Sequence, residues 1–394
     1  LPENYVVGAT GDLQNEAELE WLNQKAEQTA KIDSFPKEMD FPPSAEKTKT
    51  LHYKQDKVHD FAWFADKRFH VLKGEVELPH SKRKVTTWAM FTNSEAHLWQ
   101  NSIEYINDAV YYYSLWNGDY PYNHVTAVDG ALSAGAGMEY PNITVIGKSG
   151  SAFYLETVIM HEVGHNWFYG ILGSNERVHP WMDEGLNSFN ENRYIETKYP
   201  DANIAGDNRF NKVLKIFDMD QYLHKEQYYI GYQIGARKNL DQPIELSSEK
   251  YTYTNYGTIV YGKSALSFDY LMAYLGEETM DRVMRKYYDT WKFKHPQPED
   301  FRKTAEEESG KDLSWFFDGM INSTKKLDYK ILSAKNETGN YKVKVKNKGE
   351  IAGPFSVSAL KGDSIIFTRW YEPMDGKAIL EFPAGDYDKF RIDE

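Results

Sequence analysis

The sequence predicts a multidomain α+β protein in which a largely helical domain is flanked by β domains. The chain has 394 residues, which is too many for one compact core, so we expect two or three domains. Short runs typical of strands dominate residues 1–90, helical periodicity dominates residues 91–325, and alternation returns in residues 326–394. These three ranges are the predicted domains, and the last is expected to be a small β-sandwich.

The first region is predicted to hold one helix among several strands. The helix runs from about Asn15 to Lys31, because Leu19 and Leu22 share one side and a proline-rich stretch follows. The expected strands cover residues 5–9, 49–53, 59–65, 69–78 and 84–91.

The central region begins with a change to helical periodicity at Ser94. Thr92 and Glu95 predict a capping box ahead of one long helix that stops at Asn117-Gly118. The expected strands here are 122–128 and 142–146, and the expected further helices are 152–169, 181–199, 206–222, 260–275, 277–292, 298–309 and 312–322. After Leu327 the alternation in 341–345 and 364–368 predicts strands again.

Composition excludes several classes of protein and site. The formal net charge of −13 argues against nucleic-acid or anionic-membrane partners, which require clustered Lys and Arg. Mean hydropathy is −0.67 and no run approaches the length of a membrane span, so we predict no transmembrane segment. With no cysteine, any transition metal must be held by His and carboxylate groups. The same absence permits a periplasmic or secreted location, for which we hold a slight preference, and the oligomeric state is left open.

The residues that carry chemistry begin with His161-Glu162-Val163-Gly164-His165 in an apolar helical stretch. Two histidines at i and i+4 lie on one helix face, so their rings can converge on one Zn²⁺. Glu162 is offset around the helix, where it can reach a metal-bound water as general base without binding the metal.

A third ligand is predicted at Glu184, within Trp181-Met-Asp-Glu-Gly185 on the next helix. Two histidines and a glutamate are a catalytic zinc set that leaves one position for water. The helix pattern alone arises by chance in about a few per cent of such chains, and a Glu at a preset spacing lowers that about tenfold. We therefore expect one Zn²⁺ per chain, bound by His161, His165 and Glu184.

This spacing and the residues around it resemble the aminopeptidase N and leukotriene-hydrolase family of zinc peptidases, the gluzincins. The resemblance implies a thermolysin-like catalytic domain and removal of N-terminal residues from peptides. Upstream, Gly135-Ala-Gly-Met-Glu-Tyr-Pro141 is similar to the family motif that lies along the substrate. By resemblance, Gly137 and Met138 line the substrate and Glu139 binds its free α-amino group, which a fixed carboxylate favours.

A third family element is Val260-Tyr-Gly-Lys-Ser264, which is similar to the Tyr-x-Lys-Gly segment. The resemblance implies that Tyr261 donates to the oxyanion of the reaction intermediate, and Tyr256 is its nearest competitor. The chain departs from the family pattern at four positions: Tyr140, Asn166, Asp183 and Ser264. Asn166 and Asp183 are candidates to orient the ligands, although a solvated acid at a helix start is an equal reading of Asp183. His179 fits no ligand spacing and is read as a loop residue.

We therefore expect a zinc aminopeptidase with peptide substrates that have a free N-terminus. The alternatives are an endopeptidase, a bifunctional relative with epoxide hydrolase activity, and a noncatalytic peptide-binding scaffold of the same fold. In the family a larger β domain precedes the catalytic domain and a helical domain often follows the small β domain. Residues 1–90 are similar to the last part of that first β domain only, so we expect a fragment or a processed form.

Overall fold

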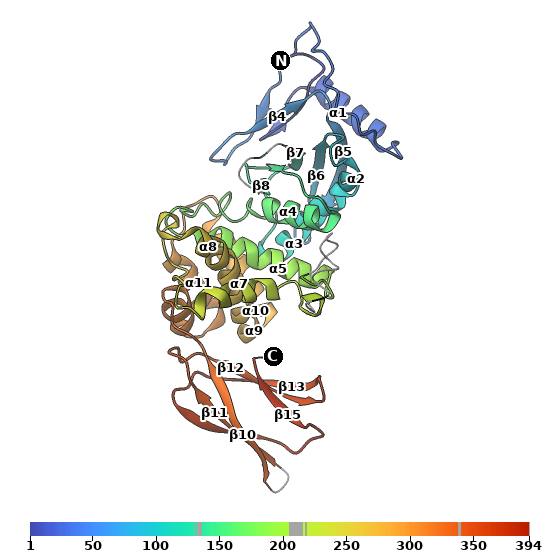
Figure 1. Ribbon diagram of the computed structural model, residues 1–394. Coiled ribbons are helices and arrows are strands. Elements are labelled where there is room, and N and C mark those ends of the chain that lie inside the picture. The colour runs from blue at the N-terminus through green and yellow to red at the C-terminus, as the bar shows by residue number, and fades with distance from the viewer. Residues whose placement is uncertain (131, 133–135, 205–215, 217–218, 338–339, 394) are drawn as a thin grey trace.

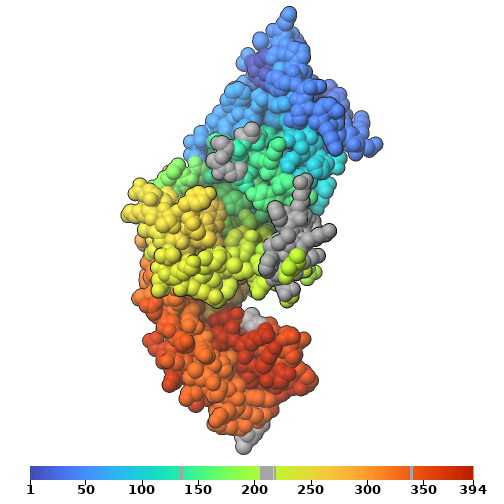
Figure 2. Space-filling model, in the orientation of Figure 1, coloured from blue at the N-terminus to red at the C-terminus, as the bar shows by residue number. Residues whose placement is uncertain are grey.

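The computed structural model describes residues 1–394 except 131, 133–135, 205–215, 217–218, 338–339 and 394. The chain runs from an N-terminal β region at one end, through a helical centre, to a β-sandwich at the other end (Figure 1). The space-filling view shows the same order from blue to red along the molecule (Figure 2). None of the described helices combines the length and apolar character that a membrane span requires. The multidomain α+β class expected from the sequence is confirmed.

A five-stranded mixed sheet organises the middle of the molecule. Its strands, in spatial order, are β5 (His70–Glu77), β6 (Lys84–Phe91), β7 (His124–Asp129), β9 (Ile143–Ile146) and β8 (Gly137–Met138). The two outer pairs are antiparallel, while β6, β7 and β9 run parallel. The sheet joins strands from both sides of residue 90, and the predicted domain boundaries stay predictions.

Alternating side chains of β6 bury the two faces of this sheet in different cores. Ala89 and Phe91 belong to the large core shared with the helices, whereas Trp88 and Met90 pack into a smaller core with Leu22. This alternation is the period of two that a strand imposes on its side chains. The smaller core lies under α1 (Glu16–Thr29) and the short strands β1 (Val6–Ala9), β2 (Asp12–Leu13), β3 (Tyr53–Lys54) and β4 (Trp63–Asp66).

The helical part supplies the elements that surround the candidate site. Its α-helices are α2 (Ala96–Trp99), α3 (Ser102–Asn117), α4 (Ala152–Gly164), α5 (Glu184–Lys198), α7 (Glu226–Ala236), α8 (Tyr253–Asn255), α9 (Ser264–Leu275), α10 (Glu277–Trp291) and α11 (Pro298–Ser309). Short 3₁₀-helices are η1 (Pro180–Met182), η2 (Met219–Gln221) and η3 (Ser248–Lys250), and π-helices are η4 (Tyr256–Lys263) and η5 (Trp315–Ile321). In Figure 1, α4 and α5 cross the centre of the molecule next to each other.

The predicted capping box at Thr92 and Glu95 is wrong, and the helix expected after it is two helices, α2 and α3. The Glu95 carboxylate accepts hydrogen bonds from the backbone of Ser149 and Gly150, while the Thr92 hydroxyl donates to Asp129. Both side chains therefore hold neighbouring loops instead of capping a helix.

One other helix boundary and one strand boundary differ from prediction for reasons that lie in tertiary contacts. The helix expected over 152–169 ends at Gly164, because Asn166 accepts from the Asn142 backbone and the Trp167 indole donates to Gly118. The strand expected over 59–65 is limited to β4, since its antiparallel partner β1 has only four residues. Helix α7 was not predicted, and the helix expected over 206–222 falls largely outside the described residues.

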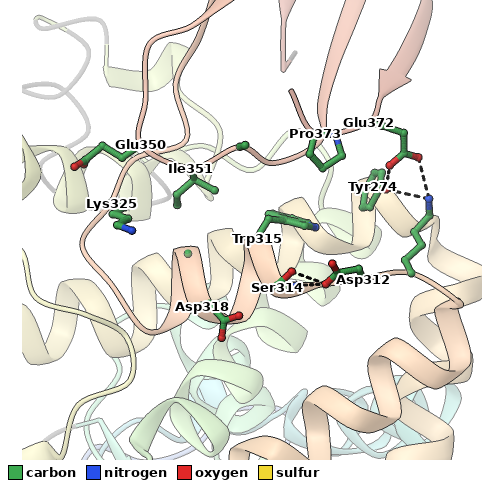
Figure 3. A pocket seen from close by; sticks show the side chains of 13 residues that line it. Tyr274, Asp312, Ser314, Trp315, Asp318, Lys325, Glu350, Ile351, Glu372 and Pro373 are labelled. Carbon is green, nitrogen blue, oxygen red and sulfur yellow. Dashed lines mark hydrogen bonds and ion pairs between the residues drawn. The ribbon is translucent and has the colours of Figure 1, made fainter. Parts of the chain in front are cut away.

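The C-terminal part forms two three-stranded antiparallel sheets packed around their own core. The sheets are β10 (Tyr329–Glu337), β11 (Asn340–Asn347) and β14 (Lys377–Phe382) on one side, and β13 (Ser364–Tyr371), β12 (Phe355–Lys361) and β15 (Lys389–Ile392) on the other. A cleft of about 600 Å³ lies where this part meets η5 and α9. Figure 3 shows side chains from both parts lining it, among them Tyr274, Trp315 and Glu372. None of the predicted site residues lines this cleft.

Candidate active site

Two helices bring the three predicted metal ligands together. His161 and His165 come from the last turn and the C-cap of α4, and Glu184 is the first residue of α5. Gly164 permits the close approach of α4 and α5, because a Cβ there would lie 2.2 Å from Oδ1 of Asn187 on α5. Gly185 permits the contact of α5 with α9 in the same way, because a Cβ there would lie 2.7 Å from Cβ of Ser264.

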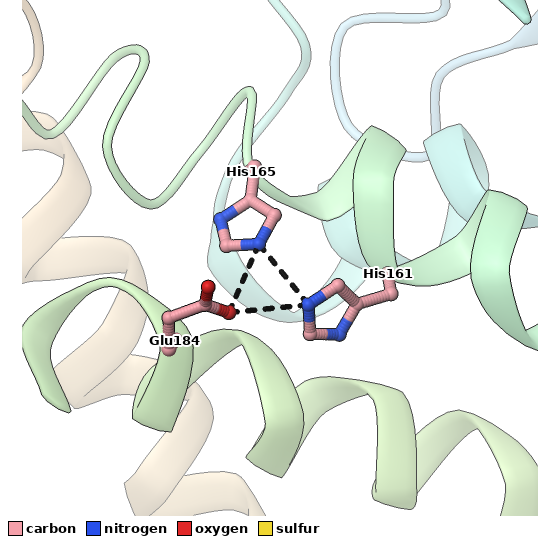
Figure 4. A group of neighbouring side chains, drawn as sticks. All are labelled: His161, His165 and Glu184. Atoms are coloured by element: carbon pink, nitrogen blue, oxygen red, sulfur yellow. Dashed lines mark hydrogen bonds and ion pairs between the residues drawn. The ribbon is translucent and has the colours of Figure 1, made fainter. Parts of the chain in front are cut away.

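The three ligand atoms face one point, as Figure 4 shows. The Nε2 atoms of His161 and His165 lie 3.1 Å apart, and each lies 3.2 Å from Oε2 of Glu184. Donor atoms placed tetrahedrally at 2.0–2.1 Å from one zinc ion would be about 3.3 Å apart. The arrangement therefore fits a single zinc ion, and the same three residues form a group able to hold a metal.

A second layer of carboxylates contacts the outer nitrogen of each histidine. Nδ1 of His165 lies 2.6 Å from Asp183, and Nδ1 of His161 lies 2.8 Å from Glu191. These contacts hold a proton on Nδ1 of each ring, so Nε2 is the nitrogen at which a metal ion would replace a proton. Asp183 is 1% exposed, so the reading as a solvated helix-start acid is wrong, whereas Asn166 contacts Asn142 and Val163 rather than a ligand.

The charges around this point favour a cation. Burial lowers the pKa of His161, but hydrogen bonds with Glu184 and Glu191 outweigh it and raise that pKa to about 10. Burial raises the pKa of Glu184, yet the two histidines outweigh it and hold that pKa well below its usual value. A site that stabilises positive charge on buried imidazoles also stabilises a divalent metal ion.

Glu162 lies between the two histidines and is 6% exposed. Burial raises the pKa of its carboxyl to about 7, within the range in which a general base works near neutral pH. The carboxylate packs directly on the backbone of Gly137, where a Cβ would lie 2.3 Å from it. The lack of a side chain at Gly137 thus leaves the room that the Glu162 carboxylate occupies, which the sequence motif did not reveal.

The segment that contains Gly137, Met138 and Glu139 borders the site from the edge of the sheet. Gly137 and Met138 form β8, which pairs with β9 only, and Met138 is 37% exposed. A Glu139 carboxylate oxygen lies within 4.8 Å of ligand atoms of His165 and Asp183. Gly135, which opens the motif, lies outside the described residues.

Tyr261 reaches the site from the π-helix η4. Its hydroxyl donates to Oε1 of Glu184 at 2.5 Å, and its ring stacks 6.0 Å from that of His161. Burial, and next the Glu184 carboxylate, raises the pKa of Tyr261 far above its usual value, so the phenol keeps its proton. The competitor Tyr256 packs edge-on against Tyr261 at 5.9 Å between ring centroids.

Two other residues singled out in the sequence lie away from the ligands. His179 binds Glu245 at 2.6 Å, in the loop before η1, and Glu245 also accepts from Trp181. Tyr140 packs against Phe64 beside the smaller core.

Two residues behind His161 were not identified from the sequence: Glu191, which contacts its Nδ1, and Tyr228, which donates to Glu191. Glu191 follows Glu184 by seven residues, two helical turns, and that spacing was a usable signal because it predicts the same helix face.

Comparison with known proteins places the central part of the chain in one family. Residues 104–320, more than half of the chain, match the model described as the peptidase family M1 domain. Aminopeptidase M1-B of Oryza sativa subsp. japonica is 25% identical over 179 residues, which cover 45% of this chain and 18% of that protein. The chain thus spans about a fifth of the length of this curated relative.

Solved structures show the same fold over most of the chain. Aminopeptidase A of Legionella pneumophila, in complex with aspartic acid, has a TM-score of 0.61 at 16% identity, covering 82% of this chain and 36% of that one. A two-domain M1 zinc metallopeptidase bound to L-arginine has a TM-score of 0.54 at 13% identity, covering 81% and 61%. On the match over residues 104–320, the chain belongs to peptidase family M1.

Proposed function

We propose that the protein is a zinc-dependent aminopeptidase that hydrolyses the first peptide bond of substrates with a free N-terminus. The observation that carries the proposal is the convergence of His161, His165 and Glu184, whose facing atoms lie 3.1–3.2 Å apart. Membership of family M1 and the names of the relatives support the same activity.

His161, His165 and Glu184 would hold the metal. A zinc ion bound there supplies Lewis acidity, which polarises a carbonyl and acidifies a water molecule. Asp183 and Glu191 keep the two imidazoles oriented, so the site is preorganised before substrate arrives.

Glu162 acts as the general base, taking a proton from the attacking water at its carboxylate and giving it to the leaving amine. Its position against Gly137 and its raised pKa suit a group that must take up and release a proton near pH 7. Tyr261 keeps its phenolic proton, and on substrate binding it exchanges its hydrogen bond to Oε1 of Glu184 for one to the oxygen on which negative charge develops.

Glu139 binds the substrate ammonium and thereby sets the register of cleavage. Its carboxylate has no hydrogen-bond or ion-pair partner in the part of the chain that the structure describes. Strand β8 lies at the sheet edge, where an extended peptide can pair with its free backbone groups. A carboxylate at the end of that edge selects a chain terminus over an internal segment.

The fold leaves the preferred first residue undecided. Structures that share it are described in complex with aspartic acid and with L-arginine, which carry opposite charges. A panel of substrates must therefore include acidic, basic and apolar first residues.

The test is hydrolysis of aminoacyl chromogenic amides by zinc-loaded protein, with a chelator control and N-acetylated versions of the same substrates. The proposal expects cleavage of free-amine substrates that the chelator abolishes and that acetylation prevents. Equal cleavage of acetylated peptides would favour an endopeptidase. Zinc binding without cleavage of any panel member would favour the noncatalytic scaffold.

A further inference from the structure

His161 is held from behind by two hydrogen bonds in series that begin on a separate helix. Its Nδ1 lies 2.8 Å from Oε2 of Glu191, and Oε1 of the same carboxylate accepts from the Tyr228 hydroxyl at 3.0 Å. Figure 4 shows that the outer nitrogen of His161 faces away from His165 and Glu184. Glu191 belongs to α5 and Tyr228 to α7, so the series joins three helices.

The two hydrogen bonds have a fixed direction. Burial, and next the Glu191 carboxylate, raises the pKa of Tyr228 well above its usual value, so the phenol stays protonated and donates. An ionised carboxylate accepts at both oxygens and has no proton to donate, so Nδ1 of His161 carries the proton in its hydrogen bond to Oε2 of Glu191. Nε2 of His161 is then the nitrogen left to bind a metal in place of its proton.

The two histidines differ in how their carboxylate partners are anchored. Asp183 is the N-cap residue of α5, next to Glu184, and it is 1% exposed, so its backbone is fixed at the start of the helix that carries the ligand. Glu191 lies two turns along α5 and is 7% exposed, and one of its oxygens would lose its donor without Tyr228. A buried carboxylate oxygen without a donor is costly, so the hydroxyl has a large influence on where this carboxylate lies.

We propose that Tyr228 is a positioning residue for the metal centre. Its hydroxyl fixes the Glu191 carboxylate, which in turn fixes the tautomer and orientation of His161. The inference rests on the proposed zinc-dependent function. Helix α7 would then contribute to metal retention although it supplies no ligand and none of its residues is fully buried.

The test compares zinc affinity in single-hydroxyl variants of the full chain. Y228F keeps the ring and removes the donor, and it should weaken zinc binding about 5-fold to 10-fold. Y229F is the matched control, because Tyr229 lies on the same helix and is 53% exposed, and it should leave the affinity within about twofold of wild type. Competition with a chromophoric chelator measures the affinity, and thermal melting of each variant checks that it is folded.

A double-mutant cycle separates positioning from packing. E191Q should weaken zinc binding about 10-fold to 100-fold, and adding Y228F to it should change the affinity by less than about twofold. E191D keeps the charge but moves the carboxylate back by one methylene, so it should also weaken zinc binding. If Y228F does not fold, E191D still tests whether the position of the Glu191 carboxylate controls zinc affinity.

The possible outcomes distinguish a failure of the positioning role of Tyr228 from a failure of the proposed zinc-dependent function. Wild-type affinity in Y228F or E191D, or fully additive losses in the double variant, would overturn the positioning role while wild-type protein still binds zinc. Failure of the wild-type protein itself to bind zinc would instead overturn the proposed function and, with it, this inference.

Discussion

The carboxylates of the site fall into two groups that the protein treats differently. On the metal side, Asp183, Glu184 and Glu191 each contact protein hydrogen-bond donors at 2.5–3.2 Å. On the substrate side, Glu139 and Glu162 have no hydrogen-bond or ion-pair partner among the residues that the structure describes. Glu139 and Asp183, one from each group, both lie within 4.8 Å of a ring nitrogen of His165, so nearness to the histidines does not explain the difference.

The difference matches the roles proposed for the two groups. A metal ligand and its supporting carboxylate must stay in one place, and hydrogen bonds from the protein hold them there. A carboxylate that receives a proton or an ammonium must keep its oxygens free, although burying an unpaired charge costs stability. Variants on the two sides should therefore separate metal retention from turnover.

The largest effect is expected at Glu162. E162Q keeps the size of the side chain but removes the base, so kcat should fall about 10³-fold to 10⁴-fold. Zinc content should be unchanged, because Glu162 binds no ligand histidine. Steady-state kinetics together with metal analysis of the same preparation measure both, and near-normal turnover would contradict its role as base.

The next effect is expected at Glu139. E139Q exchanges a charge-assisted contact with the substrate amine for a neutral one, which lowers kcat/KM for free peptides about 10-fold to 100-fold. The N-acetylated substrate loses nothing from this change, so the ratio between free and acetylated peptides should shrink. An unchanged ratio would show that another group recognises the N-terminus.

On the metal side, D183N should have the opposite profile. An amide in place of the carboxylate weakens the hold on Nδ1 of His165, and zinc affinity should fall about 10-fold to 100-fold. Turnover at saturating zinc should recover most of its wild-type value, which E162Q cannot do. The exposed Asp289 provides the control D289N, and zinc affinity equal in the two variants would remove Asp183 from the metal centre.

The metal side was also the part of the site that the sequence predicted best. The ligand pattern of α4 is local, because the spacing of His161 and His165 places them on one face of any helix. The prediction of Glu184 required only a second helix that follows the first at the spacing of a known zinc-ligand pattern. Glu191 and Tyr228 depend on how α5 and α7 pack, and α7 escaped prediction because two glycines interrupt a run rich in tyrosine.

The errors in the fold have the same origin. The ends of α4 and β4 and the break between α2 and α3 are set by contacts between segments far apart in the sequence. Glu95 illustrates this, since its spacing from Thr92 is that of a capping box but its carboxylate binds the loop at Ser149. Periodicity gave the right element types in most places, whereas their limits depended on tertiary hydrogen bonds.

The smallest effect concerns Lys263 on η4, which extends the comparison to a buried cation. Lys263 is 5% exposed, and its Nζ has one hydrogen bond among the described residues, to the Ser323 carbonyl at 3.4 Å. Burial, and next the charge of Lys326, lowers the pKa of Lys263 from its ordinary 10.5 to about 8. Like Glu139 and Glu162, Lys263 is a charged group with few protein partners among the described residues. Unlike them, it has no proposed role in turnover.

Replacing this lysine tests whether poor pairing alone costs stability. Between pH 8 and 10.5 the unfolded chain binds more protons at Lys263 than the folded chain, so its cost to folding disappears as pH rises through that window. K263M should therefore unfold with a free energy higher than wild type by on the order of 1–3 kcal/mol at pH 7, and the gap should close toward pH 10. Urea denaturation of both proteins at several pH values measures the gap. A gap that is absent at pH 7, or constant up to pH 10, would mean that the fold pairs Lys263 better than its single long hydrogen bond indicates.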